Sequence, residues 1–88
     1  MLVLDLKVKA AEFIKALPPK QSKQLAVAVF DLMKDPRPHD SIKLKGFDDY
    51  FRKDVGEYRI VYRFDKSCLY VLVIDKRNDN DAYKGLRM

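Results

Sequence analysis

Three apolar segments separated by very short connections limit the fold of this chain more than any other feature. The segments Tyr50–Val55, Tyr58–Phe64 and Cys68–Asp75 are rich in the aromatic and branched residues that favour β-strands. Gly56 marks the first break, and the turn residues 65–67 mark the second. Connections this short join antiparallel neighbours. The second half of the chain is therefore predicted to form a three-stranded antiparallel sheet.

The first half of the chain predicts a short strand followed by a helical hairpin. The strand is expected at Leu2–Leu6, and Pro18 and Pro19 separate two helices, the second of which begins at Pro19 and ends before Asp35. Apolar residues at helical spacing form one stripe on each helix: Leu6, Ala10, Phe13 and Leu17, then Leu25, Ala28, Val29 and Leu32. Each stripe needs an apolar surface, which the sheet supplies.

Together these elements predict an α+β fold of order β-α-α-β-β-β, with a helical turn near the end of the sequence. That turn is expected within 79–85, which opens with an aspartate and closes with a glycine. The 88 residues are too few for two ordinary domains, so one domain over 1–88 is expected. The segment between Asp35 and Gly46 is expected to be a long irregular loop.

The composition indicates the cellular compartment in which the protein is expected and the class of partner that it is expected to bind. The net charge of +5 favours a polyanion or an acidic protein as partner. The single cysteine, Cys68, cannot form an internal disulfide, which favours a reducing compartment. No apolar stretch approaches the ~20 residues of a membrane span, and the first residues do not resemble a signal peptide. We therefore expect a cytoplasmic protein without membrane contact.

Side-chain alternation along 58–64 separates an apolar face from a basic one. Tyr58, Ile60, Tyr62 and Phe64 share the face that suits the helices, while Arg59, Val61 and Arg63 share the other. A two-residue loop at Val55-Gly56 would place Arg52 opposite Arg59. A turn that pairs Phe64 with Cys68 would add a further set of residues to the Arg59 face: Leu69, Val71, Val73, Asp75 and Arg77.

Arg52, Arg59 and Arg77 would then converge on the side of the sheet away from the helices. Two interpretations of this arrangement remain open. The arginines could pair with Asp54, Glu57, Asp75 and Asp79 as a surface network, or they could form a cleft for phosphate or nucleic acid, since planar guanidinium groups bind phosphate oxygens bidentately. Like charges opposite one another on a sheet are unfavourable unless an anion lies between them.

Four groups of residues, in this order, resemble the RelE branch of the RelE/ParE toxin superfamily. They are Lys-Leu-Lys-Gly at 43–46, Tyr-Phe-Arg at 50–52, Val-Gly-Glu-Tyr-Arg-Ile-Val-Tyr at 55–62, and Lys-Arg at 76–77 followed six residues later by Tyr83. The resemblance covers nearly the whole chain. The third group is typical of the superfamily, and the arginine-tyrosine pair is typical of its ribonuclease branch.

The resemblance implies the toxin of a type II toxin-antitoxin pair, which cuts messenger RNA, often in the ribosomal A site, without a metal or other cofactor. It also implies an antitoxin that wraps and neutralises the toxin, with operator DNA bound only through the antitoxin complex. The ribose 2′-hydroxyl would attack the neighbouring phosphate and leave a cyclic phosphate. The protein would have to activate that hydroxyl, neutralise the phosphorane and protonate the leaving 5′-oxygen.

The resemblance also implies roles for individual residues. Arg59 would stabilise the phosphorane, and Arg77 would support the transition state or protonate the leaving group. Arg52 would hold the RNA backbone, and Tyr83 would orient the substrate. Because guanidinium groups hardly release protons, charge stabilisation is the expected role of Arg77. Further contacts to the RNA are expected from Lys45, Lys43 and Arg63.

Asp54 departs from the pattern of the resemblance, because ribosome-dependent members often have a second cation at this position. The carboxylate could be a general base, could pair with Arg52 and tether it, or could mark weakened activity. Two other functions remain open beside the ribonuclease, and only the second of them depends on Asp54. One is a ParE-like toxin that inhibits DNA gyrase, and the other is a catalytically weak homologue that acts as a partner-binding module.

Overall fold

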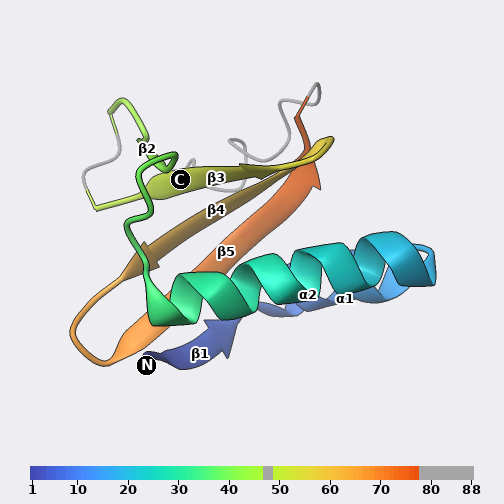
Figure 1. The fold of residues 1–88 in the computed structure, drawn as a ribbon, viewed down its shortest axis with the longest axis horizontal. Helices are drawn as coiled ribbons and strands as arrows, with labels where there is room; N and C mark the ends of the chain where they lie inside the picture. Colours follow the sequence, from blue (N-terminus) through green and yellow to red (C-terminus); the bar gives the residue numbers. More distant parts are fainter. Residues whose placement is uncertain (47–48, 78–88) are drawn as a thin grey trace.

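A computed structural model, which describes residues 1–46 and 49–77, shows two helices packed on one face of a five-stranded sheet (Figure 1). The strand order is β1-β5-β4-β3-β2, with β1 parallel to β5 and every other neighbouring pair antiparallel. The elements are β1 (Val3–Leu6), α1 (Val8–Ala16), α2 (Pro19–Lys34), β2 (Ile42–Lys43), β3 (Phe51–Val55), β4 (Tyr58–Phe64) and β5 (Cys68–Lys76).

This architecture confirms the predicted α+β fold and the helical hairpin. Pro19 occupies the first turn of α2, where its missing N–H is not needed, and α2 ends at Lys34 as expected. The loop after α2 differs from the prediction, because Ile42 and Lys43 form the short strand β2 beside β3. The predicted turn at 79–85 lies outside the described residues. No helix in the described part of the chain is long and apolar enough to span a bilayer.

The main hydrophobic core lies between the helices and the sheet. Tyr58, Ile60 and Tyr62 of β4 are buried there, as their alternation predicts, and Phe64 packs at the margin. The ring of Phe13 meets Tyr58 edge-on at 5.8 Å between centroids. The remaining buried members are Ala10, Leu25, Val29, Leu32, Phe51, Leu69, Val71 and Ile74. The helix-covered face of the sheet is therefore the apolar face.

The loop between β3 and β4 is Gly56-Glu57, not the predicted Val55-Gly56, because Val55 pairs with Tyr58. Gly56 has a φ of 58°, which suits the first central residue of a type II′ hairpin turn. The shift of one residue changes which side chains face each other. Asp54, rather than Arg52, lies opposite Arg59, and Arg52 lies opposite Val61.

A β-bulge in β5 corrects the predicted pairing of that strand. Val61 pairs with Val73, but Tyr62 pairs with Val71, so Leu72 is an extra residue. Beyond the bulge the register continues to Phe64 opposite Leu69, instead of the predicted Cys68. A one-residue shift transfers side chains to the other face of a sheet.

The predicted placement of β5 side chains on the Arg59 face is wrong for the first half of the strand and right for the second half. Leu69 and Val71 are fully buried in the helix-side core, so their predicted place on the Arg59 face is wrong. Val73 and Asp75 do lie on the Arg59 face, because they pair with Val61 and Arg59. On that face, Leu44 and Val61 form a second small cluster with Tyr50 and Val73.

Tyr62 predicts a loss of stability at alkaline pH. Its ring is fully buried, its hydroxyl donates a hydrogen bond to the carbonyl of Pro36 at 2.7 Å, and burial raises its pKa to about 12. The unfolded chain, with a tyrosine pKa near 10, loses this proton first. The free energy of unfolding should therefore fall between about pH 10 and 12, by roughly 2 kcal/mol, as measured by urea unfolding.

The control is Tyr62→Phe, which has no proton to release. This variant should be less stable at neutral pH, because the carbonyl of Pro36 loses its partner, but its stability should vary less above pH 10. The same alkaline decline in both proteins would show that Tyr62 is not its source.

Candidate functional site

Arg59 lies at the centre of the sheet face that the helices leave open. Among the residues that the structure describes, it is the single charged side chain that is buried, with 5% of its surface exposed. Asp54 on β3 and Asp75 on β5 are its direct neighbours across the two strand pairs. Its guanidinium donates a hydrogen bond to the carbonyl of Lys76 at 3.1 Å. A buried cation needs such polar surroundings, and here flanking strands provide them.

Asp54 connects the other two predicted arginines. Its Oδ1 lies 3.4 Å from Nε of Arg52, and its Oδ2 lies 3.5 Å from Nε of Arg77. The Asp54 side chain is 29% exposed, but its Oδ1 and the Nε of Arg52 are buried atoms. The contact with Arg77, which is 56% exposed, is therefore the more accessible of the two ion pairs. One carboxylate thus holds two guanidinium groups and faces the strand position of a third.

The β3–β4 hairpin loop positions Arg77. The backbone N–H of Arg77 donates to the carbonyl of Glu57 at 2.8 Å, and its guanidinium donates to the carbonyl of Gly56 at 3.3 Å. These contacts bring the end of β5 against the loop and beside Asp54. The sequence contained no signal for them, because backbone carbonyls carry no residue-type pattern.

We use the name arginine cluster for Arg52, Arg59 and Arg77 together with Asp54 and Asp75. The structure brings these five residues together on one face through β3, β4 and the end of β5. Three guanidinium groups and two carboxylates give the cluster a formal charge of +1. Such a group can bind one phosphodiester, and additional negative charge that develops during a reaction would find cations already in position.

Other predicted RNA contacts lie away from the arginine cluster. Arg63 is on the same face, but four residues along β4 it stacks on Tyr70, with its Cζ 3.9 Å from the ring centroid. Lys43 pairs with Phe51, which places it at a register position of the helix-side face. Lys45 is exposed and follows Leu44, which packs on Val61. Tyr83 lies outside the described residues.

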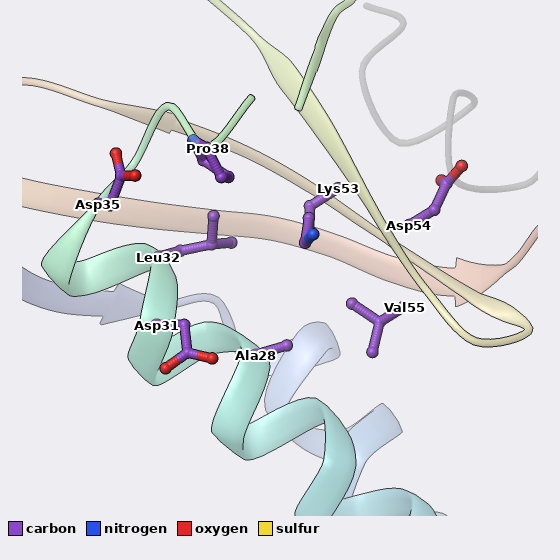
Figure 2. Close-up of a pocket in the computed structure, with 8 residues that line it drawn as sticks. All are labelled: Ala28, Asp31, Leu32, Asp35, Pro38, Lys53, Asp54 and Val55. Atoms are coloured by element: carbon purple, nitrogen blue, oxygen red, sulfur yellow. The ribbon is translucent and has the colours of Figure 1, made fainter. Parts of the chain in front are cut away.

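A pocket of about 340 Å³ lies between β3 and α2, and Asp54 is the one member of the arginine cluster among the described residues that line it (Figure 2). Figure 2 shows Lys53 and Val55 pointing from β3 toward α2, whereas Asp54 points to the opposite side of the strand. Lys53 forms an ion pair with Asp40, and its hydrogen bond lowers the pKa of Asp40. Because side chains alternate along a strand, Lys53 lies on the opposite face of β3 from Arg52 and Asp54. In residues 1–46 and 49–77, no group of His, Cys, Asp and Glu could hold a metal ion.

Comparison with known proteins identifies the fold. The sequence matches no family model and no curated protein sequence. The structure is similar to an arginine-to-alanine double mutant of the E. coli toxin RelE in the free state, with a TM-score of 0.79 and 22% identity over 96% of this chain and 92% of that chain.

Two toxin-antitoxin complexes give similar results. The E. coli RelBE complex has a TM-score of 0.74 and 24% identity over 86% of this chain and 96% of that chain. The RelE-RelB complex of Pyrococcus horikoshii has a TM-score of 0.73 and 22% identity over 86% of this chain and 94% of that chain. The chain therefore has the RelE fold.

Proposed function

We propose that this protein is the toxin of a type II toxin-antitoxin pair and that it cuts messenger RNA without a metal ion. The arginine cluster carries this proposal, because it gathers three guanidinium groups on the open face of the sheet. A domain that needed only to fold would gain little from placing Arg59 among buried strand residues. Cations placed in this way can stabilise the negative charge that a phosphate gains during a reaction.

The reaction would be an attack of the ribose 2′-oxygen on the adjacent phosphorus. The 2′-hydroxyl loses its proton, the bond from phosphorus to the 5′-oxygen breaks, and the 5′-oxygen gains a proton. The products are a 2′,3′-cyclic phosphate and a 5′-hydroxyl. The phosphorane formed on the way carries one more negative charge than the substrate, so a fixed cation stabilises it more than the ground state.

The proposal gives the three arginines different tasks, and their different burial supports this division. Arg59 is held between two strands and suits the phosphorane, because a fixed guanidinium needs no rearrangement as charge develops. Arg77 is 56% exposed at the edge of the cluster and suits contact with the phosphate and the leaving-group side. Arg52 would hold the RNA backbone, with Lys43, Lys45 and Arg63 as more distant contacts. Tyr83 would orient the substrate.

An antitoxin is the proposed protein partner. The structural neighbours include RelE proteins bound to RelB antitoxins, which supports this proposal. An acidic or amphipathic segment that covers the arginine cluster would neutralise the toxin. Ribosome-bound message in the cytoplasm is the proposed substrate, and operator DNA would be contacted only through the antitoxin complex.

Cleavage mapping tests the proposal directly. The gene is induced without its antitoxin, and the ends of cellular messages are mapped, while purified protein is assayed on message with and without ribosomes. Cuts within codons that leave cyclic phosphate ends would support the proposal. Growth arrest with intact message and damaged DNA would replace it with gyrase inhibition. Intact message with tight antitoxin binding would indicate a partner-binding module.

Arg77→Ala should lower the cleavage rate by about tenfold to a hundredfold, because the variant loses one cation beside the phosphate but keeps Arg59. The rate is measured on the same message with ribosomes. Lys76→Ala is the neighbouring control, since Lys76 pairs with Tyr58 on the helix-side face and its contribution to the cluster is a backbone carbonyl. Equal cleavage rates for the wild type and Arg77→Ala would show that Arg77 does not take part in cleavage.

A further inference from the structure

We propose that the Asp54 carboxylate is a built-in counter-ion, which holds Arg52 and Arg77 until the phosphate of an RNA substrate takes its place. This inference rests on the proposed function, because it names the ligand that displaces the carboxylate. It assigns Asp54 a regulatory effect on RNA affinity rather than a role in proton transfer.

The geometry of Asp54 is that of a bridging anion. Each carboxylate oxygen faces the Nε of a different arginine, Oδ1 toward Arg52 at 3.4 Å and Oδ2 toward Arg77 at 3.5 Å. The two non-bridging oxygens of a phosphodiester can bridge two guanidinium groups in the same way. Substrate phosphate and Asp54 therefore compete for the same two cations.

The same contacts argue against a general base. A base must present a lone pair to the 2′-hydroxyl within hydrogen-bond distance. In this structure Oδ1 of Asp54 is buried and faces Arg52, while Oδ2 faces Arg77. An RNA hydroxyl that approached Asp54 would therefore share these oxygens with the two guanidinium groups, whereas a substrate phosphate would compete for the guanidinium groups themselves.

A counter-ion at this position makes RNA binding weaker than the three arginines alone would allow. The two contacts of Asp54 are long, at 3.4 and 3.5 Å, and the Arg77 side chain is 56% exposed, so the ion pairs are modest in strength and a phosphate can replace the carboxylate at modest cost. Without the carboxylate, the arginines would attract ions from solution, and RNA would release those ions on binding. Loss of Asp54 should thus increase both RNA affinity and its dependence on salt.

The test compares the wild-type protein with Asp54→Asn, which keeps the size of the side chain but removes its charge. The probe is a fluorescent single-stranded RNA carrying 2′-O-methyl groups, which cannot be cleaved, and binding is measured by anisotropy at several salt concentrations. Asp54→Asn should bind about tenfold more tightly at low salt. Its plot of log affinity against log salt should be steeper by about 0.7 for each additional phosphate neutralised.

Glu12→Gln is the matched control for net charge. Glu12 lies exposed on α1, in the helix layer, and its substitution removes one negative charge, so it raises the net charge of the protein by the same amount as Asp54→Asn. Its affinity for RNA should change less than twofold, with an unchanged salt slope. Equal gains in Glu12→Gln and Asp54→Asn would attribute the effect to net charge and overturn the proposal.

The remaining outcomes separate this inference from the proposed function. If wild-type protein cleaves message but Asp54→Asn binds RNA no more tightly, the counter-ion is refuted and the ribonuclease stands. If the cleavage rate of Asp54→Asn is more than a hundredfold below that of the wild type while its RNA affinity is unchanged, Asp54 is a base and the counter-ion is again refuted. If wild-type protein and Asp54→Asn both neither cleave nor bind RNA, both proposals fail.

Discussion

Replacing Arg59 with glutamine should lower the maximal rate of RNA cleavage by about 100- to 1,000-fold, the range observed when one preorganised group that stabilises developing charge is removed. Glutamine keeps much of the side-chain volume and a hydrogen-bond donor for the carbonyl of Lys76, but it lacks the positive charge. The expected loss follows from the central place of Arg59, which strands β3 and β5 hold from both sides. The measurement is a single-turnover rate at saturating RNA.

Arg63→Gln is the matched control for this experiment. Arg63 lies on the same strand and the same face, but its guanidinium stacks on Tyr70 away from the arginine cluster. Its maximal rate should stay near that of wild type, although its RNA affinity should decrease. Circular dichroism and thermal melting should show that both variants are folded. A folded Arg59→Gln variant that cleaves at the wild-type rate would contradict the proposed site.

Replacing Leu69 with alanine should destabilise the protein by about 2–5 kcal/mol, because Leu69 is fully buried in the helix-side core. In a protein of this size, such a loss lowers the melting temperature by at least about 8 °C. The substitution also tests the β-bulge at Leu72, because a regular β5 would place Leu69 on the open face. The measurement is urea unfolding at neutral pH.

Leu72→Ala is the control with the same chemical change. Leu72 is the extra residue of the bulge and is only partly buried, so its loss should cost clearly less than the loss of Leu69. The difference in unfolding free energy between the two variants therefore tests the register of β5 against β4. A cost below about 1 kcal/mol for Leu69→Ala would show that Leu69 does not lie in the core.

Much of the fold could be predicted because its signals are local. Pro18 and Pro19 separate the helices, the periodic apolar residues define their buried stripes, and α2 ends before Asp35-Pro36. The alternation of Tyr58, Ile60 and Tyr62 correctly identified the helix-covered face. The short strand β2 could not be predicted in the same way. Two residues carry too little pattern, and Ile42 and Lys43 become a strand only by pairing with β3.

The candidate site was predicted in its residue types but not in its pairing. The choice of Gly56-Glu57 as the hairpin loop moves Asp54 opposite Arg59, and it differs from the alternative loop by one residue. The bulge likewise depends on one extra residue, Leu72, whose place reflects packing against both faces of the sheet. Single-residue shifts of this kind leave the composition of a segment unchanged, so sequence patterns cannot detect them.

The sequence by itself determined the helices, the antiparallel strands and the side of β4 from which Arg59 projects, because each depends on neighbouring residues and on the periods of helix and strand. Only the tertiary structure decided which anion meets which cation. Asp54 and Arg77 are far apart in the chain, and their contact exists because the end of β5 binds the β3–β4 loop through the carbonyls of Gly56 and Glu57. Backbone contacts between distant segments bring the arginines to one carboxylate, and no local pattern encodes them.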